Sequence, residues 1–236
     1  MDLQSTLLYI SQNTDINRHD VPGVLFSATI GMAAIASLFS KSDMMKIPGV
    51  TVVMTAAYGI FNDMIACRDS IEYFTRFHTW QGQNLTNRTV MNLDPNLNAI
   101  VVGGLSTIAL GGLAGLFFLM LSGNVDSESD KKIAEKQVDT RITARQLFPY
   151  LYIVTVITFV AAHFKARFAQ QAMAAAPYVK YEGVPLDMQA AWEVCNVRNT
   201  TGYLGFAIGV PLICVGIIAT RIWLYCRSQE PHEKRI

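Results

Sequence analysis

Long apolar stretches alternate with short polar segments along the whole chain. Five of the apolar stretches reach the roughly 17 to 25 residues that a transmembrane helix needs, and the segments between them hold most of the charged residues. The five stretches are 21–40, 47–66, 99–122, 147–164 and 202–220. This pattern predicts an all-α, polytopic bundle of about five transmembrane helices that forms one integral membrane domain over residues 1–236.

Composition agrees with a chain whose main partner is the lipid bilayer. Apolar residues make up 51% of the 236 residues and charged residues 16%, below the roughly 25% that is usual in soluble proteins. Five spans place the polar segments alternately on two sides, and one set of segments carries 11 Lys and Arg residues while the other carries 8. Because cytoplasmic segments are richer in these residues, we expect an extracytoplasmic N-terminus, a cytoplasmic C-terminus and a cytoplasmic loop at 123–146.

The stretch YGIFNDMIACRDSIEYFTRFH places ionisable residues inside and just beyond the second predicted span. A charged residue within a span normally faces protein or water and has a partner, so we expect Asp63 to lie within salt-bridge or water-bridged reach of Lys165 or Arg167 at the same depth of the fourth span. Arg68 and Glu72, four residues apart, are predicted to pair on another helix face. The candidate cluster comprises Asp63, Arg68, Glu72, His78, His163, Lys165 and Arg167.

This cluster has two interpretations. In the first, its ion pairs and hydrogen bonds join the second span to the fourth, and its role is structural. In the second, Asp63, Glu72, His78 and His163 form a functional site, because carboxylates and imidazoles can bind a metal ion or move protons. The residues do not identify a metal or any other cofactor.

Cysteines and glycosylation sequons fall in the predicted extracytoplasmic segments. Cys67 follows the second span and Cys195 precedes the last one, so an oxidising compartment would allow a disulfide between them, with two unpaired thiols as the alternative. Asn84 and Asn87 lie in Asn-x-Ser/Thr sequons, which predict a glycoprotein. A third sequon, at Asn199, lies so close to the last span that a transferase would struggle to reach it.

Small residues recur at every fourth position of the third span, at Gly103, Thr107, Gly111 and Gly115. This spacing lets helices approach closely in lipid, where the hydrophobic effect gives little drive for association. We therefore expect close packing within the bundle, with contacts to other membrane subunits through such glycine-rich faces as the alternative. The sequence shows no basic, aromatic-rich surface of the kind that binds nucleic acid, so we expect no nucleic-acid partner.

Three parts of the chain resemble a family of uncharacterised bacterial multi-pass membrane proteins. The stretch YGIFNDMIACRDSIEYFTRFH is similar to the family's YGxx(H/N)D…EYFTxxH segment, NAIVVGGLSTIALGGLAGLFF to the span that follows it, and VRNTTGYLGFAIGV to the last span. The resemblance implies a multi-pass fold and no particular activity. It also leads us to expect His at two positions where this chain has Asn62 and Asn199. If those histidines bind a metal or move protons in the family, this chain has lost them.

Sequence motifs of familiar enzymes are absent from the chain. It has no Gly-rich phosphate loop and no CxxC, HExxH or GxSxG sequence. We therefore expect a non-enzymatic membrane protein that handles ions or solutes or assists the assembly of a membrane complex. A membrane-embedded enzyme or metal-binding protein with an extracytoplasmic site of His and carboxylate groups is the alternative.

These classes make different predictions about the cluster. Ion handling predicts that Asp63 faces a water-filled cavity, because a charge on a transport pathway must be hydrated. An enzyme predicts that His78 or His163 converges with a carboxylate. An assembly protein predicts close glycine-mediated packing in which every polar group is paired.

Overall fold

The computed structural model describes residues 21–74, 95–124, 139–175 and 179–229. Its long helices are α2 (Val21–Leu38), α3 (Asp43–Asp69), α5 (Pro95–Leu121), α7 (Ala144–Ala175) and α8 (Gln189–Ser228), and a short 3₁₀ helix, η2 (Leu186–Met188), precedes α8. No strand occurs in these described ranges. The prediction of an all-α helical bundle is therefore confirmed.

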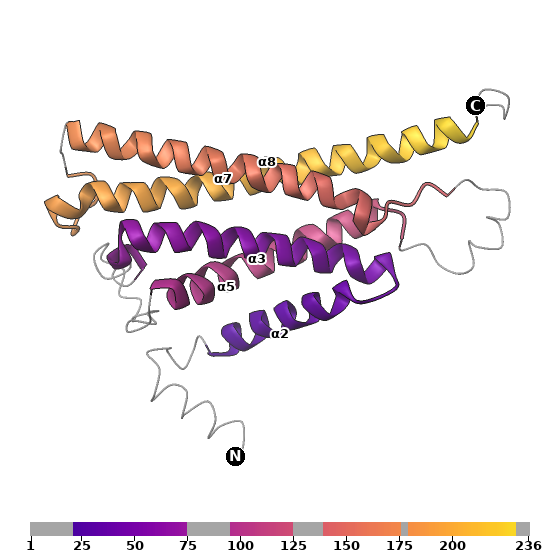
Figure 1. Ribbon diagram of the computed structural model, residues 1–236, viewed down its shortest axis with the longest axis horizontal. Coiled ribbons are helices and arrows are strands. Elements are labelled where there is room, and N and C mark those ends of the chain that lie inside the picture. The colour runs from indigo at the N-terminus through magenta and orange to yellow at the C-terminus, as the bar shows by residue number, and fades with distance from the viewer. Residues whose placement is uncertain (1–20, 75–94, 125–138, 176–178, 230–236) are drawn as a thin grey trace, which may run out of the picture.

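The long helices lie side by side, and consecutive helices run in alternating directions (Figure 1). α3 and α7 end, and α5 and α8 begin, at one end of the bundle, which we call the Asp63 end. α3 and α7 begin at the opposite end. The helices thus alternate in direction as the apolar pattern predicts.

Four helices are long and apolar enough to cross a membrane: Asp43–Asp69, Val102–Leu121, Ala144–Ala175 and Leu186–Ser228. The first predicted span is present as α2, although the part of α2 with described side chains, Phe26–Leu38, is a shorter apolar helix. Large apolar side chains point outward all around the bundle, among them Phe26, Leu113, Ile157, Leu212 and Val215. An outward apolar surface of this extent marks contact with lipid. Together these features indicate an integral membrane protein with several spans.

Close contact between α3 and α5 depends on glycine. A Cβ added at Gly59 would overlap the carbonyl oxygen of Gly103, and a Cβ added at Gly115 would lie 2.7 Å from Pro48 Cα. At Gly111 an added Cβ would lie 3.0 Å from Val52 Cα. The glycine-rich face of α5 is therefore covered by α3 within the molecule, as expected for packing inside the bundle, and is not free to bind another subunit.

The last helix begins much earlier than the apolar pattern indicates. α8 starts at Gln189, whereas the apolar stretch starts at residue 202. Gln189, Glu193 and Arg198 lie on this first part of the helix and are buried. Because these polar residues lower the mean hydropathy of the segment, hydropathy alone does not reveal that it is helical. The early start brings polar α8 side chains against the end of α3.

Candidate functional site

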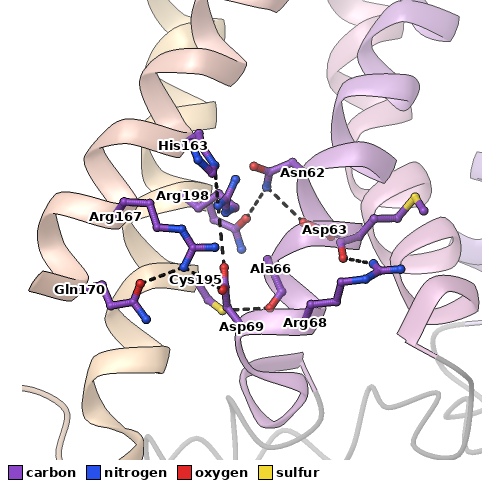
Figure 2. Close-up of polar contacts among 12 residues, drawn as sticks. Asn62, Asp63, Ala66, Arg68, Asp69, His163, Arg167, Gln170, Cys195 and Arg198 are labelled. Atoms are coloured by element: carbon purple, nitrogen blue, oxygen red, sulfur yellow. Dashed lines mark hydrogen bonds and ion pairs between the residues drawn. The ribbon is translucent and has the colours of Figure 1, made fainter.

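Two amide side chains join α3 to α8 at the Asp63 end. Asn62 Nδ2 donates a hydrogen bond to Asn199 Oδ1 at 2.9 Å and lies 3.3 Å from Asp63 Oδ1 (Figure 2). Asn62 and Asp63 are only 3% and 6% exposed. Asn199, which belongs to the third sequon, therefore points toward α3 and contributes to helix contact.

Asp63 lines a small cavity between α3, α5 and α8 that has both polar and apolar walls, and we call it the Asp63 cavity. Its volume is about 60 Å³. A water molecule needs roughly 10 to 15 Å³ of such space, so several waters fit. The polar groups that line the cavity include those of Thr55, Tyr58, Asn62, Asp63, Thr107 and Asn199.

The direct ion pair predicted between Asp63 and Lys165 or Arg167 is not formed. Among the described residues, Asp63 has no Lys or Arg nitrogen within 4.0 Å of its carboxylate. The carboxylate instead faces α5, where a Cβ added at Gly103 would lie 3.0 Å from Asp63 Oδ2. Lys165 is exposed, and Arg167 pairs with a different carboxylate. The direction in which Asp63 points around α3 therefore excludes the pair.

Asp69 is the carboxylate that joins α3 to α7 and α8. Its Oδ1 lies 3.1 Å from Arg167 Nη1, and its Oδ2 lies 3.8 Å from Arg198 Nη2. Arg198 is fully buried, and its Nη2 also lies 3.5 Å from His163 Nδ1. These four residues gather in one place (Figure 2) and are called here the Asp69 cluster. The structural role that we predicted for Asp63 therefore belongs to Asp69.

Helical spacing is the signal that could have identified Asp69. Asn62, Ala66 and Asp69 are four and three residues apart, which places them on one face of α3. This face contacts α8: the Cys195 thiol donates to the Ala66 carbonyl oxygen at 3.3 Å, and Arg198 pairs with Asp69. The apolar stretch ends at Ala66, so hydropathy placed Asp69 outside the span and drew attention to Asp63.

The predicted disulfide between Cys67 and Cys195 is not formed. Both cysteines are buried and both are free. Cys195 contacts Ala66 rather than Cys67, and neighbouring residues on a helix point about 100° apart around its axis. Two unpaired thiols, the alternative left open by the sequence, are what the structure contains at these positions.

The other predicted site residues are separated from Asp63 or lie outside the described residues. α3 ends at Asp69, and Ser70 is extended, so Arg68 and Glu72 do not share one continuous helix, as their predicted pairing required. Arg68 donates to the backbone oxygen of Met64, and Ser70 Oγ donates to Glu72 at 3.2 Å. The remaining predicted residues, His78, Asn84 and Asn87, fall outside the described ranges.

A second polar network holds the segment before α8 against that helix. Lys180 Nζ lies 2.7 Å from Glu193 Oε1, and the Tyr181 hydroxyl donates to Glu193 Oε2. Gln189 Nε2 donates to the carbonyl oxygens of Tyr181 and Val184 at 2.8 and 2.7 Å. Burial, followed by the bond to Glu193, raises the pKa of Tyr181 well above its ordinary value. None of these residues belongs to the candidate cluster predicted from the sequence.

A metal centre has no support among the described residues, where no group of three or more His, Cys, Asp or Glu side chains is placed to hold an ion. Asn62 and Asn199, at which the family resemblance leads us to expect His, are in contact with each other. The resemblance itself stays a prediction. Comparison of the chain with protein-family models, curated protein sequences and solved structures gives no match.

Proposed function

We propose that this multi-pass membrane protein binds and conducts protons or a small monovalent cation, with Asp63 as the binding residue. One observation carries the proposal: Asp63 is 6% exposed, lines a cavity within a span together with several hydroxyl and amide groups, and has no cationic side chain in ion-pair distance among the described residues. A carboxylate within a span costs a few kcal/mol and normally has a partner. A proton or a cation in the cavity would supply the missing positive charge.

The size of the Asp63 cavity favours an ion over an organic solute. An engineered cavity that binds benzene has a volume of about 150 Å³, whereas the Asp63 cavity has a volume of about 60 Å³. Waters and a small cation fit this space, while a sugar or an amino acid does not.

The lining of the cavity favours a monovalent ion. Hard cations prefer oxygen ligands from carboxylate, amide and hydroxyl groups, and Asp63, Asn62 and Thr107 offer all three. Asn62 Oδ1 is buried and has no hydrogen-bond partner, so it is free to accept. With a single carboxylate, the site matches the charge of one proton or one monovalent cation.

Unpaired polar atoms weigh against a purely structural or assembly role. Such a role predicts that every buried polar group is paired, but Tyr58 Oη and Asn62 Oδ1, whose side chains line the Asp63 cavity, are buried without a hydrogen-bond partner, as are Asp69 Oδ2 and two guanidinium nitrogens of Arg198 in the Asp69 cluster. An unpaired buried acceptor or donor costs roughly 1 to 3 kcal/mol. Bound water or an ion in the cavity would offset this cost.

Reconstitution in liposomes tests the proposal. The purified protein is reconstituted in liposomes that hold a dye responsive to the ion tested, one for pH, one for Na⁺ and one for K⁺, and a gradient of that ion is imposed. We expect uptake of one of these ions, and we expect Asp63→Asn to slow it about tenfold or more, because a charged ligand is lost. The exposed carboxylate of Asp187 supplies the matched control, Asp187→Asn. Wild-type rates in Asp63→Asn, or no uptake of any of the three ions by the wild type, would refute the proposal.

We also propose that the Asp63 end is extracytoplasmic. The excess of Lys and Arg, 11 residues against 8, supports a cytoplasmic location for the opposite end and for residues 123–146. Glycosylation of Asn84 and Asn87, which precede α5, would agree with this orientation.

A further inference from the structure

A second cavity lies farther from the Asp63 end, between α3, α5, α7 and α8; it is partly open to the surface of the bundle, and we call it the inner cavity. Its volume is about 70 Å³, which again suffices for several water molecules. Thr55, Tyr58, Gly202 and Phe206 line both this cavity and the Asp63 cavity. The two cavities therefore adjoin, and their shared wall contains the side chain of Tyr58.

Hydroxyl groups give the inner cavity a polar side. Thr51, Thr55 and Tyr58 contribute hydroxyls from α3, and Thr155 and Thr158 contribute hydroxyls from α7. The hydroxyls of Thr51 and Thr55 donate to backbone oxygens one turn earlier, at 2.8 and 2.6 Å. Since a hydroxyl that donates one hydrogen bond can still accept others, these oxygens remain available to a water molecule or a cation.

Tyr58 occupies the boundary between the cavities because α8 carries a glycine there. A Cβ added at Gly202 would lie 2.5 Å from Tyr58 Oη and 3.2 Å from Tyr58 Cζ, so only glycine leaves room for the ring. The Tyr58 hydroxyl is buried and has no hydrogen-bond partner. A phenol in this position can accept from or donate to a ligand on its way between the cavities.

Apolar side chains close the inner cavity on the side away from Asp63. Phe118, Leu151 and Ile213 line it and also belong to the largest apolar cluster of the bundle. A dry apolar cluster is a poor environment for an ion. The polar lining that leads away from Asp63 therefore extends as far as the inner cavity in this structure, and conduction beyond it requires that these apolar side chains move apart.

We propose that the inner cavity is a second binding site for the ion that Asp63 binds, and that the Tyr58 ring is the barrier between the two sites. The identity of the ligand, a proton carried by water or a small monovalent cation, rests on the proposed function. The proposal that Tyr58 forms a barrier does not depend on the proposed function, because it is argued from the two cavities and the wall that they share. Ions bound at Asp63 reach the threonine hydroxyls by passing the Tyr58 ring, which must rotate to let them through. The Tyr58 hydroxyl serves as a ligand during this passage.

Silver ions test the barrier, because Ag⁺ is a small monovalent cation that reacts with thiols. Thr158→Cys places a reporter thiol in the inner cavity, and Thr107→Cys places a control thiol in the Asp63 cavity. Each purified full-length variant is exposed to Ag⁺ in detergent, then denatured and alkylated. Mass spectrometry of the peptide with the introduced cysteine gives the rate at that site and excludes the natural cysteines. Circular dichroism confirms that each variant is folded.

We expect Tyr58→Ala to speed the reaction of Thr158→Cys about tenfold or more and to leave the rate at Thr107→Cys unchanged. Equal rates at Thr158→Cys with and without the Tyr58 ring would overturn the barrier. Reaction of Thr158→Cys as fast as that of Thr107→Cys in the presence of Tyr58 would also overturn it.

Tyr58→Phe separates the ring from its hydroxyl and keeps the packing. We expect it to leave Thr158→Cys as slow as in the parent protein and to slow ion uptake in liposomes about tenfold, because one ligand is lost. Unchanged uptake would refute the role of the hydroxyl. The result for Asp63→Asn distinguishes the two proposals: unaffected uptake in that variant refutes the ion-binding function, whereas the silver rates decide the barrier by themselves.

Discussion

Asp63 and Asp69 are two carboxylates near the end of one helix, and their surroundings give them different roles. Asp69 lies 3.1 Å from Arg167 and 3.8 Å from the fully buried Arg198. Asp63 faces α5 and the cavity, without an arginine in ion-pair distance. They are six positions apart, which is about 1.7 helical turns, or about 9 Å along the axis. A structural carboxylate and a candidate ion-binding carboxylate therefore coexist at one end of the bundle.

Removal of Asp69 should destabilise the fold more than removal of Asp63. Asp69→Ala leaves Arg198 buried without its carboxylate, and breaking a buried pair in this way costs about 3 to 5 kcal/mol. We expect a marked loss of thermal stability and of yield in detergent for Asp69→Ala. Asp63→Asn, which removes no ion pair, serves as the control and should unfold at nearly the wild-type temperature. Equal stability of Asp69→Ala and the wild type would contradict the structural role of the cluster.

Tyr181 should make stability depend on pH in the alkaline range. Burial and Glu193 raise its pKa in the folded state, whereas the unfolded chain has a tyrosine pKa of about 10. Above pH 10 the unfolded state therefore loses the proton first, and the free energy of unfolding should fall as the pH rises. Below pH 10 both states hold the proton, and this contribution is complete.

Unfolding monitored by circular dichroism between pH 9 and about 11.5 checks this dependence. Tyr181→Phe should be less stable at neutral pH by about 1 to 2 kcal/mol, because the bond to Glu193 is lost. Its stability should also fall less steeply above pH 10. The same slope in the variant and the wild type would show that another group titrates there.

At the scale of elements, α3 and α5 form the closest contact, and glycine makes it possible. Gly59 and Gly103 lie where a Cβ on either residue would overlap the opposing backbone. Backbone cannot move aside as a flexible side chain can. The α3 and α5 pair therefore forms one wall of the Asp63 cavity and holds it in a fixed shape.

Two glycine substitutions should have opposite outcomes. Gly59→Ala forces α3 and α5 apart and should cost about 1 to 3 kcal/mol, as overpacking usually does. Gly112→Ala is the matched control on α5, since a Cβ there meets no atom within 4 Å. We expect Gly112→Ala to be neutral or slightly stabilising, because alanine favours the helical state. Thermal unfolding in detergent measures both, and a neutral Gly59→Ala would contradict the observed contact.

Hydropathy predicts the helical elements well, because every backbone group in lipid must be satisfied within a helix. It fails at α8, where Glu193 and Arg198 interrupt the apolar pattern although they are buried on one helix. It also cannot give the rotation of α3, which decides that Asp63 faces α5 and Asp69 faces Arg198. The sequence identifies the polar end of α3 as a site, but its pairing depends on contacts between residues far apart along the chain.

At the scale of the whole molecule, the helix directions place the start of α7 at the end opposite to Asp63 (Figure 1). The proposed orientation puts that opposite end in the cytoplasm. A cysteine introduced at Asp130, in the segment before α7, should therefore resist a membrane-impermeant thiol reagent added to intact cells. It should react once the cells are made permeable. Labelling of residue 130 in intact cells would reverse the proposed orientation.

The Asp69 cluster also has a consequence for the order of events during synthesis. Asp69 leaves the ribosome about a hundred residues before Arg167 and still earlier than Arg198, a delay of roughly 5 to 20 s at usual elongation rates. During this interval α3 and α5 can already associate through their glycines, whereas Arg167 and Arg198, which pair with Asp69, have not yet been synthesised. The ion pairs can therefore form only after α7 and α8 have been synthesised, and a chain stalled before α7 should be cleaved by proteases faster than the finished protein.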